Sequence, residues 1–176
     1  GIDLGEDSRN GKGIVASIKE LEEEGYQFDV AEGSLKILME KLTEQYKPHF
    51  ELESFRVIVE KDKEKPCSAT AMIKIKVGDT IEITAAEGDG PVSALDNALR
   101  KALTNLFPEL DEMYLVDFKV RVIEGTDGTD ARVRVIISSR DQDNIFNTIG
   151  VSEDIIEASW QALSDSFQYK LSMKEK

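Results

Sequence analysis

Cysteine, histidine and tryptophan each occur only once in these 176 residues, which removes several classes of chemistry at the outset. Cys67 alone forms no internal disulfide, so cysteine content favours the cytoplasm. A single histidine, His49, cannot build a multi-histidine metal site or pair with a nucleophile as its base. We therefore expect no catalytic residue, no metal ligand and no cofactor in this chain.

Basic residues are also few, because 22 lysines and arginines stand against 35 aspartates and glutamates and give a formal net charge of −13. Such a chain has no basic face to neutralise phosphates, and an anionic membrane surface would repel it. The first residues also lack the basic segment and apolar run of a secretion signal. We expect no nucleic-acid partner and no membrane partner, and we interpret the carboxylates of Asp141 to Asp143 as solvated.

Helical periodicity marks the N-terminal part of the chain. Residues 1–13 are polar and glycine-rich and are interpreted as a linker. Apolar residues then recur at helical spacing from Ile14 until Gly25, a glycine that is expected to end the helix. A second apolar stripe follows Ser34, which is a candidate helix cap. These two short helices predict a small helical linker subdomain over residues 1–50.

From Phe55 onward the apolar residues alternate with polar ones, as in half-buried strands. Ala69 to Val77 continues the alternation, and Gly78-Asp79 predicts a tight turn into a third strand. Helical spacing returns after Pro91. Apolar Ile58, Met72 and Ile136 lie among the polar alternates of the sheets, so we expect a sheet face that finds a partner and forms a homodimer.

The same order of elements then occurs a second time. The matched segments are Phe55 to Val59 with Phe118 to Val122, Ala69 to Val77 with Ala131 to Ser139, Ala94 to Leu99 with Ala158 to Leu163, and Thr84 with Thr148. A spacing this long that occurs only twice favours a two-unit domain over a solenoid. The predicted fold class is α+β, with duplicated βββα units related by pseudo-twofold symmetry and preceded by the helical linker subdomain. The units cover about residues 54–107 and 115–171, within a domain of residues 51–176.

The segment Gly88-Asp-Gly-Pro-Val92 follows a strand and opens a helix. With Pro91 at the first helical position and Gly90 as the cap, the amides of Val92, Ser93 and Ala94 are expected to lack helical partners and to suit an anion. A tight turn without any ligand explains the same residues. At the equivalent junction of the second unit, Ser152 is the expected cap, and the acidic Glu153 and Asp154 in the first turn would repel a ligand carboxylate.

Three blocks of sequence resemble the C-terminal allosteric, dimer-forming domain of the citramalate synthase and 2-isopropylmalate synthase family. They are Gly88-Asp-Gly-Pro-Val-Ser-Ala-Leu95, Gly125-Thr-Asp-Gly-Thr-Asp-Ala-Arg-Val-Arg-Val135, and Thr148 to Leu163. The helices around Ile18 to Ser34 are similar to the linker of the citramalate-type branch, which we favour. Two positions depart from the family pattern: Ser93 replaces an aspartate and Phe146 a tryptophan, which leaves the identity of the effector open.

The resemblance implies a regulatory domain that dimerises and binds a branched-chain amino acid, isoleucine or leucine, for feedback inhibition. The effector residues that it implies, with an apolar wall added, are Gly88, Asp89, Gly90, Val92, Ser93, Ala94, Leu99 and Leu115. The parent enzyme would use a divalent metal and acetyl-CoA in a catalytic barrel that is missing from this chain. One alternative is a dimerisation module without a ligand. A small enzyme built on Asp79, Glu82 and Glu87 is disfavoured, since no paired base or nucleophile supports it.

Overall fold

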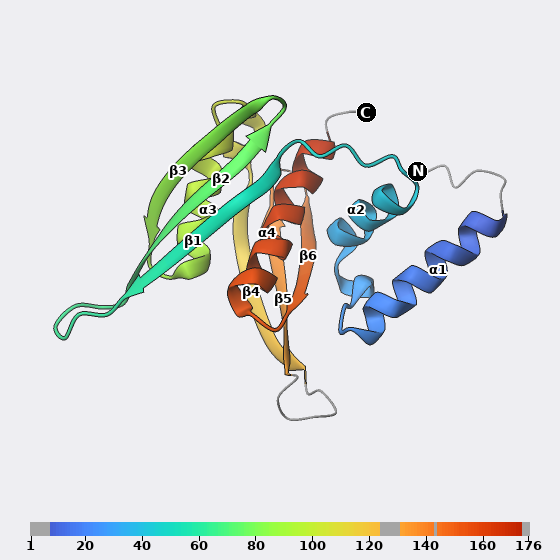
Figure 1. Cartoon of the computed structure of the whole chain (residues 1–176), viewed down its shortest axis with the longest axis horizontal. Helices are drawn as coiled ribbons and strands as arrows, with labels where there is room; N and C mark the ends of the chain where they lie inside the picture. Colours follow the sequence, from blue (N-terminus) through green and yellow to red (C-terminus); the bar gives the residue numbers. More distant parts are fainter. Residues whose placement is uncertain (1–7, 124–130, 143, 174–176) are drawn as a thin grey trace. The chain divides into compact units, whose positions relative to one another are not determined.

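Two three-stranded antiparallel sheets, each followed by a helix, make up the repeats in the computed structural model (Figure 1). The structure describes residues 8–123, 131–142 and 144–173. The elements are α1 (Ser8–Glu23), α2 (Glu32–Leu42), β1 (Glu51–Glu60), β2 (Ser68–Val77), β3 (Thr80–Gly88), α3 (Pro91–Leu103), β4 (Tyr114–Ile123), β5 (Arg132–Arg140), β6 (Ile145–Ser152) and α4 (Ile155–Ser172), with short 3-10 turns at Phe28–Val30 and Pro108–Glu112. The α+β class and the duplicated βββα order are confirmed.

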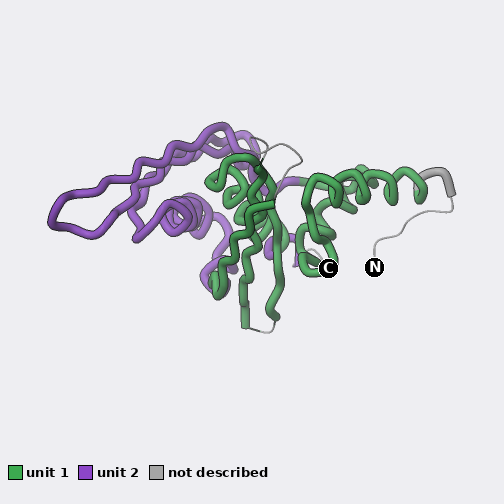
Figure 2. The backbone as a smooth tube through the Cα atoms, turned by 90° about the horizontal axis from the view of Figure 1, so that it is seen from below, with its two compact units in different colours: residues 1–47, 114–169 green, residues 48–113, 170–176 purple. Residues whose placement is uncertain are grey.

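The chain divides into two compact units, drawn in different colours in Figure 2. Unit 1 contains residues 1–47 and 114–169, and unit 2 contains residues 48–113 and 170–176. Each unit therefore holds one three-stranded sheet and most or all of the helix that follows it, and unit 1 also holds the N-terminal helices. In each unit, the face of the sheet that is turned away from its own α3 or α4 is called the outer face.

In unit 2 the period-two pattern of β2 decides which side chains enter the core. Ala69, Ala71, Ile73 and Ile75 are all buried, while the intervening Met72 is half exposed on the outer face. The helix α3 packs against β2 and β3 and contributes Leu95, Leu99 and Leu103, which are fully buried. At the β2–β3 turn, Gly78 takes a φ of +58°, which is accessible to glycine at little cost.

The two repeats share a threonine that joins strand to helix. Thr84 Oγ1 donates to the carbonyl of Ala98 at 2.7 Å, and Thr148 Oγ1 donates to the carbonyl of Ala162 at 2.7 Å. Because Thr84 pairs with Ile73 and Thr148 pairs with Ile137, equivalent residues of β2 and β5, and of β3 and β6, are 64 positions apart. The predicted match of Ala69 to Val77 with Ala131 to Ser139 is therefore wrong by two residues, a shift that keeps every side chain on the same face.

The N-terminal segment packs onto unit 1. The structure begins helix α1 at Ser8, so the part of the predicted linker from Ser8 to Gly13 is helical. The helix ends at Glu23, and Gly25 follows it with a φ of +114°, as expected of a helix-ending glycine; the next amide, of Tyr26, donates to the Leu21 carbonyl. Buried Phe28 and Ala31 then meet Ile149 and Val151 of β6 on the outer face of the second sheet.

Helix α2 lies along β6, the edge strand of the second sheet (Figure 1). A Cβ on Gly33 would lie 2.9 Å from the Asn147 carbonyl oxygen, so only glycine allows this approach. Three amides of β6 find side-chain acceptors: Asn147 binds Glu32, Ile149 binds Ser34 and Val151 binds Gln161. This edge is thus closed by side chains, which protects it from pairing with another strand.

Candidate functional site

The turn between β3 and α3 has the geometry expected for a helix start. Gly90 is the cap residue in an extended conformation (φ −163°, ψ 173°), and Pro91 takes the first helical position. The Ala94 amide donates to the Gly90 carbonyl at 2.9 Å, so the expectation that this amide lacks a helical partner was wrong. It is the first amide that reaches an acceptor four residues earlier. The amides of Val92 and Ser93 precede it and are the ones left for an anion.

The two glycines of this turn have different roles. A Cβ on Gly88 would lie 2.4 Å from the Ala94 nitrogen and 2.7 Å from the Ser93 carbonyl carbon, so Gly88 lets the strand end pack on the helix. A Cβ on Gly90 would meet nothing within 4 Å. The glycine at position 88 therefore has a structural explanation, whereas the open space at Gly90 is available to a ligand or a second subunit.

The remaining predicted site residues divide by burial and by unit. Asp89 and Ser93 are exposed beside the two glycines, and Val92 is partly buried. Ala94 and Leu99 are fully buried in the core of unit 2 and present no surface to a ligand. Leu115 lies in β4 of unit 1, at the register irregularity of that strand. The turn thus brings together Gly88, Asp89, Gly90, Val92 and Ser93.

Two side chains of α3 that sequence analysis did not select hold the strand beside this turn. Asn97 donates through Nδ2 to the Glu87 carbonyl at 2.8 Å, and Lys101 donates through Nζ to the Ala85 carbonyl at 3.2 Å. Their spacing of four residues places them on one side of the helix, and this spacing is the signal that could have identified them. Together they fix the last residues of β3 against α3.

The equivalent junction of unit 1 is occupied by the protein's own carboxylate. Asp154 Oδ1 accepts from the amides of Ile156 at 2.7 Å and Glu157 at 2.9 Å. The predicted cap Ser152 was therefore wrong: its hydroxyl instead accepts from the Asp154 amide. Aspartate at this position satisfies two amides at once and complements the helix dipole, which leaves no place for a ligand carboxylate.

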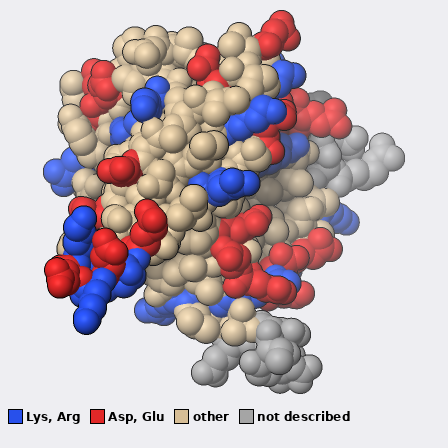
Figure 3. Space-filling model, turned by 60° about the vertical axis from the view of Figure 1, so that its left-hand side comes forward, with Lys and Arg blue, Asp and Glu red and all other residues tan. Residues whose placement is uncertain are grey.

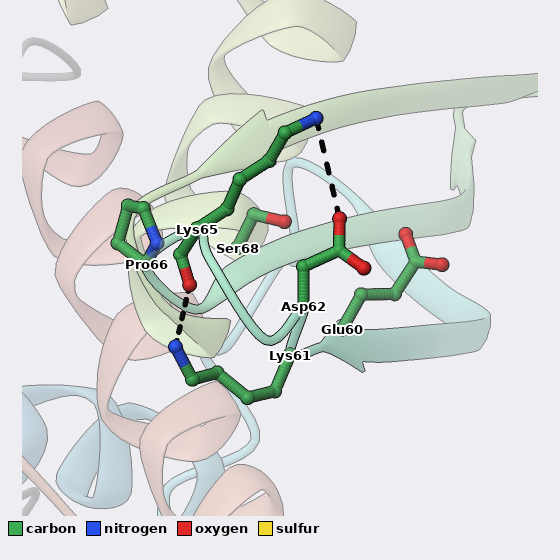
Figure 4. Close-up of a pocket in the computed structure, with 6 residues that line it drawn as sticks. All are labelled: Glu60, Lys61, Asp62, Lys65, Pro66 and Ser68. Carbon is green, nitrogen blue, oxygen red and sulfur yellow. Dashed lines mark hydrogen bonds and ion pairs between the residues drawn. The ribbon is translucent and has the colours of Figure 1, made fainter.

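A larger cavity, of about 590 Å³, lies at the β1–β2 loop and is shown in Figure 4. Its charged side chains are largely satisfied within the loop, because Lys65 lies 4.0 Å from Asp62 and Lys61 donates to the Lys65 carbonyl. These groups are exposed on a hairpin, where such ion pairs contribute little energy. We assign no function to this cavity.

A buried polar link in unit 1 was also missed by sequence analysis, which took Ser34 for a helix cap. Ser34 lies inside α2, and its Oγ donates to Asp165 Oδ2 at 2.7 Å and accepts from the Ile149 amide at 2.9 Å. Burial raises the pKa of Asp165 to about 6, against the lowering effects of the Ser34 hydrogen bond and of Lys41. Ionisation of Asp165 at neutral pH therefore lowers the free energy of unfolding.

This link predicts a pH-dependent stability. Because the folded pKa of Asp165 lies above the ordinary value of 3.8, the free energy of unfolding should fall as pH rises from about 4 through about 6. Asp165→Asn keeps an acceptor for Ser34 without the charge, so it should stabilise the protein at pH 8 by on the order of 2 kcal/mol and little at pH 4. Urea unfolding at both pH values measures this. Glu157→Gln on the same helix is the control, and an equal gain from it would contradict the assignment.

Asp141 differs from the expectation of a solvated carboxylate. It is buried, and its Oδ1 accepts from the Asn144 amide at 2.8 Å. Asp143 lies outside the described residues. Cys67 is exposed. Within the described ranges, no three His, Cys, Asp or Glu side chains are grouped to hold a metal ion.

Basic and acidic side chains are interspersed on the face shown in Figure 3, where the blue side chains form no continuous patch. No helix in the described part of the chain is long and apolar enough to cross a bilayer.

The sequence profile of the LeuA allosteric (dimerisation) domain matches residues 29–171. The chain belongs to this family. The resemblance seen in the three sequence blocks is thereby confirmed, and the LeuA-type domain starts within the N-terminal segment that packs on β6.

Relatives of this LeuA-type domain are longer proteins. The chain is 50% identical over 164 residues to (R)-citramalate synthase of Geobacter sulfurreducens, covering 92% of this chain and 31% of the relative. It is 44% identical over 176 residues to (R)-citramalate synthase of Aquifex aeolicus, and 41% identical over 162 residues to that of Synechocystis, covering 99% and 90% of this chain. The chain spans about a third of the length of these relatives.

Proposed function

We propose that this domain is the feedback-regulatory module of a larger acyltransferase and binds a branched-chain amino acid, isoleucine or leucine. The observation that supports this most is the β3–α3 turn, where open space at Gly90 adjoins the amides of Val92 and Ser93 in a domain of an allosteric family. The ligand carboxylate would accept from these two amides, and the exposed carboxylate of Asp89 would receive the ammonium group. A dimerisation module without a ligand is the alternative.

The names of the relatives support a parent enzyme that makes citramalate in branched-chain amino-acid biosynthesis, with a 2-isopropylmalate synthase as the second candidate. We propose that the condensation of acetyl-CoA with a 2-oxo acid and its divalent metal belong to a catalytic barrel elsewhere in the same protein. This domain would be non-catalytic and would act in the cytoplasm. Release of CoA from acetyl-CoA and pyruvate by the isolated chain, above a buffer control, would contradict this assignment.

We also propose that the domain forms a homodimer through the outer face of the first sheet. Ile58 is 50% exposed, Met72 is 51% exposed and Ile83 is 63% exposed, and all three lie on this face. Apolar side chains grouped in this way usually lie in an interface. Ile136, which we expected to belong to the same kind of surface, is partly covered by the N-terminal segment in unit 1.

Charge placed on this face should weaken the dimer. We expect a dimeric mass for the unmodified chain. The double variant Met72→Lys, Ile83→Lys should dimerise at least tenfold more weakly, because two cations would be buried in each protomer without partners. Light scattering over a range of concentrations measures this. Val15→Lys changes a residue of α1 that is exposed to a similar degree and should leave the mass unchanged. A monomeric mass for the unmodified chain would contradict the proposal.

Hydrogen exchange distinguishes the regulatory proposal from a dimerisation module alone. Saturating isoleucine or leucine should slow exchange of the Val92 and Ser93 amides, because a bound carboxylate accepts from them. The amides of Ile156 and Glu157, which already bind Asp154, are the internal control and should not change. If neither amino acid nor valine alters exchange at the turn in a dimeric protein, the module serves dimerisation only.

A further inference from the structure

A second cavity, of about 370 Å³, opens on the outer face of the second sheet beside the segment that leads into α2. Three cations from two strands line it, together with apolar and polar side chains: Lys119, Arg121, Arg134, Val30, Ile136 and Ser138. All of these residues belong to unit 1. Such a concentration of positive charge is unexpected in a chain whose net charge is −13.

The two arginines lie directly opposite each other. Arg121 of β4 and Arg134 of β5 are cross-strand partners, a placement that is destabilising for like charges. Two neighbouring cations of this sheet have carboxylate partners, since Lys119 lies 2.8 Å from Asp117 and Arg132 lies 3.4 Å from Glu24. Within residues 8–123, 131–142 and 144–173, no carboxylate forms an ion pair with Arg121 or Arg134.

The Arg134 guanidinium is also held in place and partly removed from water. Its Nε donates to the Gly25 carbonyl, which fixes the direction of the side chain. Burial lowers the pKa of Arg134, repulsion from Arg121 lowers it further, and Asp29 acts in the opposite direction. Asp29 therefore compensates only part of the positive charge. A bound anion would supply the rest and would accept hydrogen bonds from a pre-oriented donor.

We propose that this cavity binds a small organic anion, whose carboxylate or phosphate group lies between Arg121 and Arg134. The apolar side chains of Val30 and Ile136 suit a short hydrocarbon part, and the polar Ser138 can bind a second polar group of the ligand. This site goes beyond the proposed function. It lies entirely in unit 1, whereas the β3–α3 turn lies in unit 2, so the two proposals fail independently.

The test is a titration of the whole chain with inorganic phosphate or succinate, monitored by nitrogen NMR of the arginine side chains. A titration with sodium chloride of the same ionic strength is the control. We expect saturable shifts of the Arg121 and Arg134 signals with phosphate, with succinate or with both, which also identifies the acid group preferred. Arg121→Gln changes an exposed side chain and should weaken binding about tenfold. Arg140→Gln changes an exposed cation of β5, outside the cavity, and is the matched control that should bind as the unmodified chain does.

Arg134→Lys serves as a second variant, because it keeps the charge and loses the planar fork, and it should also weaken binding. Circular dichroism confirms that both variants are folded. Shifts that do not saturate, or equal affinity in Arg121→Gln and the parent, would overturn the proposal. Saturation by an aspartate-rich peptide but by neither small anion would also overturn it, and would identify the cavity as a protein-binding surface.

Discussion

Replacing Gly150 with alanine is expected to destabilise the domain by about 3 kcal/mol, the largest effect of any single methyl group that we predict. A Cβ at this position would lie 2.0 Å from the Ala158 carbonyl oxygen and 2.8 Å from the Gln161 Cβ. Because the nearer of these atoms, the Ala158 carbonyl oxygen, belongs to the backbone of α4, a side-chain rotation cannot relieve the contact. Helix α4 must move away from β6, which would lengthen the Thr148 to Ala162 hydrogen bond.

Urea unfolding followed by circular dichroism measures this difference. Gly90→Ala is the matched control, because a Cβ there meets nothing within 4 Å and the backbone is extended. Its stability should stay within about 0.5 kcal/mol of the parent. Equal stabilities of Gly150→Ala and Gly90→Ala would show that the close packing of β6 on α4 is not as described.

Gly90→Val is expected to weaken effector binding at least tenfold while leaving the fold unchanged. The extended backbone at Gly90 accommodates a β-branched residue, so the expected loss comes from the ligand's space and not from strain. The added methyl groups would fill the open space at Gly90, through which we propose that the ligand reaches the Val92 and Ser93 amides. Fluorescence or calorimetric titration of both proteins with isoleucine and leucine measures the ratio of dissociation constants.

The control for this variant is the equivalent junction of the other repeat. Glu153→Val changes an exposed residue next to Asp154 and should leave effector affinity within about twofold of the parent. A Gly90→Val protein with the parent's circular dichroism spectrum and the parent's affinity would place the effector elsewhere.

The strands and the repeat were predictable because burial imposes period two on a half-buried strand, as Ala69 to Ile75 show. The match of Ala69 to Val77 was two residues out, because a shift of two residues keeps the same alternation. The sequence match of Thr84 with Thr148 had the correct offset of 64, and their hydrogen bonds to α3 and α4 show that these threonines are equivalent. These bonds join residues that are 14 positions apart, which no local pattern reveals.

Polar residues were harder to assign, since their partners come from tertiary packing. Ser34 looked like a helix cap and instead binds Asp165, 131 positions later in the chain. Asp141 looked solvated but is buried, and its carboxylate accepts from the Asn144 amide. At the candidate site, the sequence predicted the cap at Gly90 correctly. It could not show that Gly88 is required by packing and Gly90 is not, because that depends on the distance to α3.

Isothermal titration calorimetry of the chain with isoleucine, leucine and valine tests the central claim most directly. Our account predicts saturable binding of isoleucine or leucine, with at most one molecule per protomer and with weaker binding of valine, whose shorter side chain buries less apolar surface. Absence of saturable heat for all three amino acids, in a protein shown to be folded and dimeric, would contradict a regulatory role for this domain.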